Sequence, residues 1–219
     1  MNFKGVNYRT EWVELPDVTS VRKSLEVPAN RTHRDGSPFY TLPIIKDLST
    51  GEVVGDSFEI AQYLDKTYPD APSLFPASST ISHEGRAFNA QVDAIFTNHV
   101  IICIHGLPFN PQTAEISKKT FVERAGKENW DELTARGEER TKTNEAFKAA
   151  LGDLAEVYGK KKGPFLEDNV PSYADLIVGG WLQFFKATLP LEEWQAIQTW
   201  HDGTWRKLYK ALGKYADIK

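Results

Sequence analysis

The sequence predicts two parts of different class, a small α/β domain followed by an all-helical domain. Strand and turn signals dominate before roughly residue 70, and helical periodicity dominates after residue 80. Between them, "PDAPSLFPASSTIS" holds three of the chain's twelve prolines and is typical of a linker. We therefore expect an α/β domain over residues 1–70, a linker over 71–80 and an all-helical domain over 81–219.

The first half of the α/β domain is predicted from alternation, turn pairs and a single glycine. Glycine commonly ends helices, and alternating β-formers such as "YRTEWVEL" are typical of a strand. The expected elements are the end of a helix at 1–4 capped by Gly5, a strand at 8–15 ended by Pro16, a short helix from Asp17 and a loop at 27–40 containing Asp35-Gly36 and Ser37-Pro38.

The stretch "YTLPIIKDLSTGEVVGDSFEIAQYL" (40–64) predicts a β-hairpin followed directly by a helix. "TLPIIKD" and "VVGD" are the expected strands, and "STGE" is the turn between them. From Ser57 to Tyr68 apolar residues recur at helical spacing, and Pro69 follows the helix.

Beyond the linker, periodic apolar positions predict helices separated by proline and glycine breaks. The expected elements are a helix over about 82–103, a loop around Pro108–Pro111, an intermittently helical stretch to Trp130, a helix over about 131–158 with weak points at Gly137 and Gly152, an apolar helix in "SYADLIVGGWLQFFKA", and a short and a final helix in "PLEEWQAIQTWHDGTWRKLYKALGKYA".

Composition excludes several classes of function. A net charge of −4 leaves no basic surface for nucleic acid, and the longest apolar runs are far short of a membrane span. The N-terminus lacks the apolar core of a signal peptide. The single cysteine, Cys103, lies in the apolar run "HVIICIHG", so we interpret it as an inert core thiol. One cysteine allows no internal disulfide, so we expect a reducing, cytoplasmic location.

Pro43 lies inside a run of β-formers, where it removes a donor from the strand ladder. A cis bond at this proline would turn the backbone of Leu42 outward, where its N–H and C=O could pair with an extended peptide. The alternative is a strand that simply begins at Ile44.

Asp56 and Ser57 stand at the junction of strand and helix. Ser57 is a natural N-cap, and the first-turn N–H groups attract an anion such as an α-carboxylate. Asp56 could then take the neighbouring α-ammonium, so that the pair recognises a free amino-acid head group. Ordinary helix capping explains the same two residues, and in isolation it is the favoured interpretation.

Two other motifs have weaker signals for chemistry. Arg31, His33 and Arg34 could meet a second carboxylate at the far end of a bound peptide, and a solvated loop explains them equally well. In "PSYAD", Ser172 and Asp175 form a variant of the capping box, to which we assign a structural role only. The histidines show no metal-ligand spacing, so no metal site is expected.

Together these motifs resemble the glutathione transferase family. The Leu-Pro strand, the hairpin and "DSFEIAQYLDKTYP" are similar to the family's Glu/Asp-Ser motif and the "AI..YL...YP" helix, and "SYADL" is similar to the capping box of its second domain. "RTEWVELPD", "DGSPFYTLPIIKD" and "STGEVVGDSFEIAQYLD" most resemble the fungal class related to glutathione-dependent β-etherases. The resemblance covers nearly the whole chain and implies a thioredoxin-like N-terminal domain with an all-α C-terminal domain.

The resemblance also implies how glutathione, the family's co-substrate, is held. The Leu42 backbone beside a cis Pro43 would pair with the cysteinyl unit, Asp56 and Ser57 would hold the γ-glutamyl head, and His33 or Arg34 would lie near the glycyl end.

In the family, the first strand and the Ser, Tyr or Cys that activates the thiolate precede the part that "MNFKGVNYRTEW" resembles. We therefore expect an N-terminally truncated domain, which lacks the first strand and most of the first helix, and we name no catalytic side chain. Loss of that strand would remove ladder partners from "YRTEWVEL" and "TLPIIKD".

The function implied by the resemblance is conjugation of glutathione to hydrophobic electrophiles, or cleavage of aryl ethers. The alternative is a non-catalytic, ligandin-like protein that binds glutathione or aromatic small molecules. Because the family is usually dimeric, the resemblance also implies a homodimer.

Overall fold

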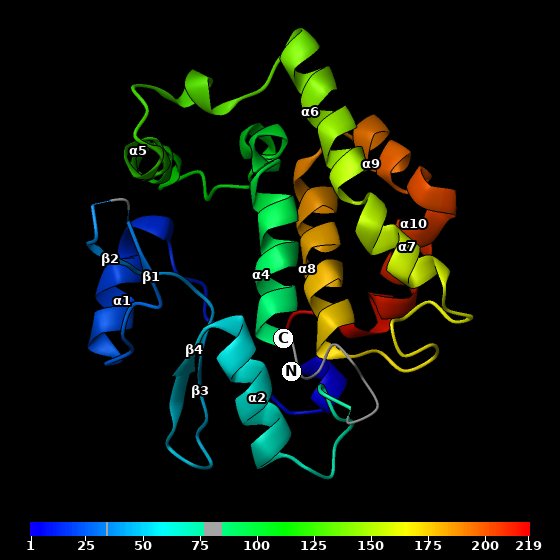
Figure 1. The fold of residues 1–219 in the computed structure, drawn as a ribbon. Helices are drawn as coiled ribbons and strands as arrows, with labels where there is room; N and C mark the ends of the chain where they lie inside the picture. The colour runs from blue at the N-terminus through cyan, green and yellow to red at the C-terminus, as the bar shows by residue number, and fades with distance from the viewer. Residues whose placement is uncertain (34, 77–84) are drawn as a thin grey trace.

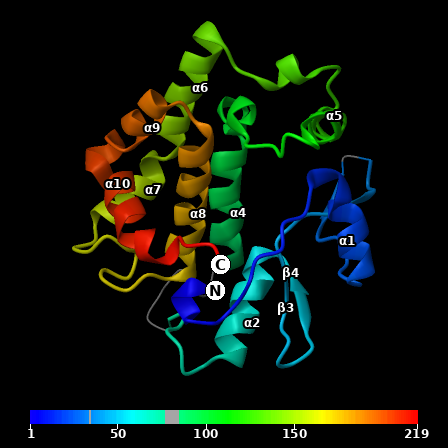
Figure 2. The same cartoon turned by 180° about the vertical axis from the view of Figure 1, so that it is seen from behind.

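The computed structural model describes residues 1–33, 35–76 and 85–219. An α/β part comes first and a helical part follows, in the order that the sequence predicts. The two chain termini lie near each other where the two parts meet (Figures 1 and 2).

Three helices form the junction between the parts. Helix α2 (Ser57–Thr67) lies beneath the N-terminal ends of α4 (Gly85–Thr97) and α8 (Tyr173–Thr188), which run side by side (Figure 1). The predicted helix after the hairpin is thereby confirmed. All three helices point their N-terminal ends toward this junction, so polar groups from both parts meet there.

The described strands form two separate antiparallel pairs. The hairpin predicted at 40–56 is confirmed, with Ile45 opposite Val54. A smaller hairpin lies inside the segment expected to be a loop. The strands are β1 (Arg31–Thr32), β2 (Pro38–Phe39), β3 (Ile44–Lys46) and β4 (Val53–Gly55).

Two short elements near the N-terminus follow the prediction. A 3₁₀ turn at Asn2–Lys4 ends at Gly5, whose φ of 65° is left-handed and favours glycine. The helix expected from Asp17 is α1 (Val18–Ser24), preceded by a 3₁₀ turn at Leu15–Asp17.

The strand predicted at 8–15 is wrong. Residues 6–14 have no regular secondary structure and none of their side chains is buried; Trp12 is 81% exposed. A strand needs a neighbouring ladder of N–H and C=O groups. In the described part of the chain, one backbone bond holds residues 8–13, from Thr10 N–H to the Lys219 carbonyl at 2.5 Å. Alternating β-formers without a neighbouring strand therefore stay extended but unpaired.

The helix predicted at about 82–103 ends earlier than expected. Residues 82–84 lie outside the described residues, and α4 stops at Thr97. The Thr97 hydroxyl donates to the Asp93 carbonyl at 2.5 Å, and the His99 ring contacts the Ile95 carbonyl at 2.7 Å. The His99 ring thus occupies the Ile95 carbonyl, to which the His99 N–H would donate in a continuing helix. Two 3₁₀ turns follow at Val100–Ile102 and Ile104–Gly106.

The helix predicted at about 131–158 is two helices, and both predicted weak points lie at helix starts. Gly137 has a φ of 51°, which a continuous helix does not permit and which glycine adopts without strain. The first of the two helices begins there, and the second begins at Gly152. The remaining α-helices of the described residues are α5 (Ala114–Ala125), α6 (Gly137–Ala150), α7 (Gly152–Gly159), α9 (Leu191–Ile197) and α10 (Trp200–Leu212).

The buried apolar side chains of the described residues form two hydrophobic cores. The larger lies among the helices and is centred on aromatic side chains with no exposed surface, including Phe96, Phe147 and Phe185. The smaller joins α2 to the segments around it and includes Phe58 and, from the helical part, Tyr173. Because this core crosses the boundary between the two parts, packing fixes their relative position.

Gly106 marks the closest approach between the 3₁₀ turn Ile104–Gly106 and the end of α8. A Cβ atom at this position would lie 1.7 Å from the Thr188 carbonyl oxygen, so the backbone itself would have to shift. We expect Gly106→Ala to lower the free energy of unfolding by about 1–3 kcal/mol, as overpacking does. Urea denaturation followed by circular dichroism measures this loss. Gly180→Ala is the control, because a Cβ there meets nothing within 4 Å; equal stability of the two variants would contradict the prediction.

Candidate functional site

The N-terminus of α2 is the centre of the candidate site. The structure corrects the expected cap: Asp56 is the N-cap residue and Ser57 is the first residue of the helix. The Asp56 carboxylate accepts from the Phe58 N–H at 3.1 Å, so Asp56 takes the capping role expected of Ser57. As a result the Ser57 side chain is released from capping and lies exposed at the helix tip.

The Leu42–Pro43 peptide bond is cis, and strand β3 begins at Ile44, so both interpretations of Pro43 are confirmed. Leu42 is 41% exposed, and the Pro43 carbonyl accepts from the Asp56 N–H at 3.1 Å. This hydrogen bond joins the Leu42–Pro43 segment to the start of α2. It therefore holds the exposed Leu42 and the exposed Ser57 in a fixed relation to each other.

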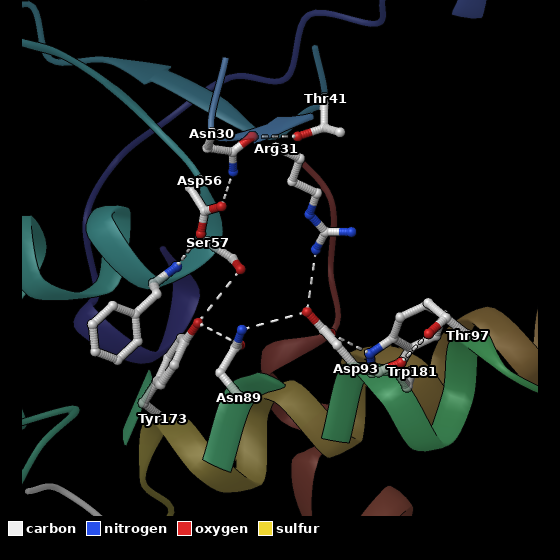
Figure 3. A network of polar contacts seen from close by, with 11 residues as sticks. Asn30, Arg31, Thr41, Asp56, Ser57, Asn89, Asp93, Thr97, Tyr173 and Trp181 are labelled. Carbon is white, nitrogen blue, oxygen red and sulfur yellow. Dashed lines mark hydrogen bonds and ion pairs between the residues drawn. The ribbon is translucent and has the colours of Figure 1, made fainter. Parts of the chain in front are cut away.

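The Asp56 carboxylate is ionised and already hydrogen bonded. Burial on its own raises the pKa of this carboxyl, but hydrogen bonds that include those from Phe58 and Asn30, together with the nearby Arg31 charge, hold the pKa below its ordinary value. The Asn30 side-chain amide donates to Asp56 Oδ2, and the Thr41 hydroxyl donates to Asn30 Oδ1 at 3.2 Å (Figure 3). A carboxylate can accept more than the two bonds that Asp56 makes here, so capacity remains for a cation.

Helices α4 and α8 supply the other wall of the site (Figure 3). The Tyr173 hydroxyl lies 3.4 Å from Ser57 Oγ and 3.2 Å from Asn89 Oδ1. Asp93, one turn after Asn89 on α4, accepts from Trp181 Nε1 at 2.9 Å and from Arg31 at 3.4 Å. Polar groups from both parts of the chain thus form one continuous network.

His33 lies in another part of the α/β domain than the N-terminus of α2. His33 lies in the turn of the β1–β2 hairpin, where its ring contacts Phe39 edge-on with a centroid separation of 4.6 Å and its N–H donates to the Ser37 carbonyl at 2.8 Å. The described hydrogen bonds do not join His33 to Asp56 or Ser57. Arg34 lies outside the described residues.

Several residues of the network were not singled out by sequence reasoning. Asn89, Asp93 and Tyr173 come from segments far along the chain from Ser57, and contact across such distances leaves no local pattern. The signals that were present are modest. Asn89 and Asp93 are spaced i, i+4 on one helix face, and Tyr173 lies inside the "SYAD" motif.

The interpretation of Cys103 as a core thiol is confirmed. Its side chain is completely buried, and burial raises its pKa to about 12. A thiol with that pKa is almost entirely protonated near neutral pH, so it is not a nucleophile.

Across 1–33, 35–76 and 85–219, no helix is long and apolar enough to cross a membrane. Within the same ranges, His, Cys, Asp and Glu do not gather in groups of three or more that could hold a metal ion.

Comparison with domain families gives two matches. Residues 1–67 match the domain described as "Glutathione S-transferase, N-terminal domain", and residues 86–215 match the one described as "Glutathione S-transferase, C-terminal domain". These matches confirm the predicted fold class, a thioredoxin-like α/β domain with short sheets followed by an all-helical domain.

Individual relatives point the same way. The chain is 30% identical to the glutathione S-transferase-like protein ustS of Aspergillus flavus, over 96% of this chain and 79% of the relative. The glutathione S-transferase CsGST63524 of Ceriporiopsis subvermispora, crystallised with glutathione, superposes with a TM-score of 0.87 at 34% identity, over 100% of this chain and 88% of that one. The transferase GSTFuA3 of Phanerochaete chrysosporium superposes with a TM-score of 0.85 at 29% identity, over 100% and 87%.

The two matching domain families follow each other along the chain, and the fungal relatives align with at least 96% of it. Both findings agree with the motifs at Pro43, Asp56 and "SYAD". The chain therefore belongs to the glutathione S-transferase family.

Proposed function

We propose that this protein binds glutathione at the N-terminus of α2 and transfers it to a hydrophobic electrophile, or uses it to cleave an aryl ether. The observation that supports this most directly is the exposed Ser57 at the helix tip, next to Asp56, whose N–H donates to the carbonyl of Pro43 beside the exposed Leu42. A relative 34% identical to this chain was crystallised with glutathione.

The residues present fit two parts of glutathione, the γ-glutamyl head and the cysteinyl unit. The positive end of the α2 dipole and Ser57 suit the γ-glutamyl α-carboxylate, and the ionised Asp56 suits its α-ammonium. The Leu42 backbone beside Pro43 suits the cysteinyl unit, which is held as an added strand. His33 and Arg34 are proposed for the glycyl carboxylate by family resemblance.

Glutathione supplies the reacting thiol when it is bound. In conjugation its sulfur forms a bond to an electrophilic carbon, the thiol proton is lost to base, and a leaving group departs with its bonding electrons. The electrophile class proposed is apolar and aromatic, because the half-buried Trp181 and Phe184 adjoin the network from the helical side. We do not assign any residue of this chain as the side chain that activates the thiol of glutathione.

The architecture proposed with this function is the predicted one: a glutathione-binding domain over 1–70, a linker over 71–80 and a helical domain over 81–219, in a cytoplasmic homodimer. Sedimentation equilibrium tests the dimer, since a mass near twice 24.7 kDa is expected.

Ser57→Ala tests the binding site. We expect it to weaken glutathione binding about 10-fold or more, because a hydrogen bond to a charged group contributes about 1.5–3 kcal/mol. Isothermal titration calorimetry measures the dissociation constant. Ser24→Ala is the matched control, since the Ser24 hydroxyl donates to the Val21 carbonyl on α1, outside the proposed site.

Three results of that titration are informative. Equal affinity of wild type and Ser57→Ala would contradict the site, and no binding by the wild type would overturn the function. Binding without turnover of any electrophile or aryl ether would favour the ligandin-like alternative.

A further inference from the structure

Tyr173 lies where the two parts of the chain are joined. Its backbone N–H donates to the Leu74 carbonyl at 2.8 Å, and its ring packs between Phe58 and Phe75 with centroid separations of 5.6 and 5.2 Å. The ring is therefore fixed by contacts that do not involve its hydroxyl. That hydroxyl emerges from the small core beside Ser57 (Figure 3).

The Tyr173 hydroxyl has one proton and two acceptors within reach. Ser57 Oγ lies at 3.4 Å and Asn89 Oδ1 at 3.2 Å. Burial raises the pKa of this phenol far above its usual value, so the proton is retained at any physiological pH. The proton is given to one of the two acceptors at a time.

Asn89 competes for that proton because its amide is oriented by a fixed neighbour. Asn89 Nδ2 donates to Asp93 Oδ2 at 3.4 Å, and Asp93 is itself held by Trp181 Nε1 at 2.9 Å. With the amide nitrogen toward a carboxylate, the amide oxygen faces Tyr173. Side chains of the helical domain therefore fix the orientation of the Asn89 amide, and with it the direction of the hydrogen bond from Tyr173 to Asn89.

The choice of acceptor decides what Ser57 offers to a ligand. When Tyr173 donates to Ser57, the serine proton is free to donate to a carboxylate at the α2 tip, and each bond in such a chain strengthens the next. When Tyr173 donates to Asn89, its oxygen becomes an acceptor for the serine proton, which then points away from the ligand.

We propose that Tyr173 is a positioning residue of the α-carboxylate subsite: its hydroxyl orients the Ser57 hydroxyl toward the γ-glutamyl α-carboxylate of glutathione, in competition with Asn89. This inference rests on the proposed function. It assigns to the helical domain a specific part in recognising the glutamyl end, besides its packing against the first domain.

Tyr173→Phe removes the hydroxyl and keeps the ring packing. We expect it to weaken glutathione binding about 5–10-fold, the worth of a hydrogen bond of about 1 kcal/mol or slightly more. The chemical control is glutathione whose γ-glutamyl α-carboxylate is converted to the primary amide. Its affinity should change less than about 2-fold, because the charge-assisted bond is absent from it. Calorimetry with both ligands measures how much affinity Tyr173→Phe loses for glutathione and how much it loses for the amide.

Two further variants make the test independent of folding. Asn89→Ala, on the half-buried face of α4, frees the Tyr173 proton for Ser57, so glutathione should bind about 2-fold more tightly than to wild type. In the double variant Ser57→Ala/Tyr173→Phe, the second substitution should add little to the first, because coupled residues are not additive. Tyr209→Phe on α10 is the matched control.

The outcomes separate the two proposals. If wild type does not bind glutathione, the proposed function and this inference both fail. If wild type binds and Ser57→Ala weakens binding, but Tyr173→Phe leaves the affinity unchanged, this inference alone is overturned. Equal losses for glutathione and its amide, or additive losses in the double variant, also overturn it, because Tyr173 would then act through packing. A loss of glutathione affinity in Asn89→Ala would also overturn the inference about Tyr173.

Discussion

Asp175→Ala is expected to lower the free energy of unfolding by about 4 kcal/mol or more. The Asp175 side chain has no exposed surface and accepts four hydrogen bonds, each between 2.8 and 3.0 Å. The donors are the Tyr158 hydroxyl, the Leu166 N–H, and the N–H and hydroxyl of Ser172. Truncation leaves these donors buried without a partner, at about 1–3 kcal/mol each before relaxation.

The isosteric variant Asp175→Asn tests whether the acceptors matter, as opposed to the volume. All four partners of Asp175 are donors, and an asparagine presents one acceptor oxygen and one NH₂ group. The NH₂ would face other donors, so we expect Asp175→Asn to lose more than half of what alanine loses. Urea denaturation measures both. Asp153→Ala on α7 is the exposed control and should stay within about 0.5 kcal/mol of wild type. A nearly neutral asparagine variant would contradict the account.

The Asp175 site shows what the sequence predicts well. The capping box at "PSYAD" is read from two residues three positions apart, and the structure confirms it. The hairpin and α2 are equally local, because proline, turn residues and helical periodicity in 40–68 suffice to define them. Where neighbours along the chain make the decisive contacts, the pattern is sufficient.

The sequence predicts less where the decisive contact comes from elsewhere. Residues 8–15 have strand composition, but a strand also needs a partner, and composition cannot supply one. Ser57 is as good an N-cap by type as Asp56, and the Asn30 amide that helps to hold the Asp56 carboxylate lies 26 residues away. Tyr173, which reaches Ser57 across 116 positions, is found only in three dimensions. The sequence therefore predicts the part of the candidate site that comes from local motifs, and it does not predict the part that comes from tertiary contacts.

Arg22→Ala is expected to lower the free energy of unfolding by about 3–5 kcal/mol. Arg22 is 1% exposed, and its guanidinium donates to the Pro28 carbonyl at 3.0 Å and to the Thr41 carbonyl. No ion pair joins it to a carboxylate in the part of the chain that the structure describes. Alanine leaves two carbonyls without these donors, at about 1–3 kcal/mol each, and adds the cost of a cavity.

Arg22→Met separates packing from hydrogen bonding, because methionine refills much of the volume and donates nothing. We expect it to recover part of the stability lost in the alanine variant, with the remainder belonging to the two carbonyls. Arg9→Ala is the surface control, since the Arg9 side chain is 85% exposed. Thermal unfolding followed by circular dichroism measures all three. A methionine variant as stable as wild type would show that the two hydrogen bonds contribute nothing net.

Arg22→Met should also weaken glutathione binding, even at temperatures well below the unfolding temperature of the variant. Pro28 and Thr41 bound the segment that holds Asn30 and Arg31, and Thr41 directly precedes the exposed Leu42. With Arg22 in place, one buried side chain fixes both ends of that segment against α1. Without it, the segment must be ordered by the ligand, and part of the binding free energy is spent on that ordering. We therefore expect Arg22→Met to bind glutathione more weakly than wild type while remaining folded, as calorimetry at 10 °C would show; unchanged affinity would mean that the segment is held by its other contacts.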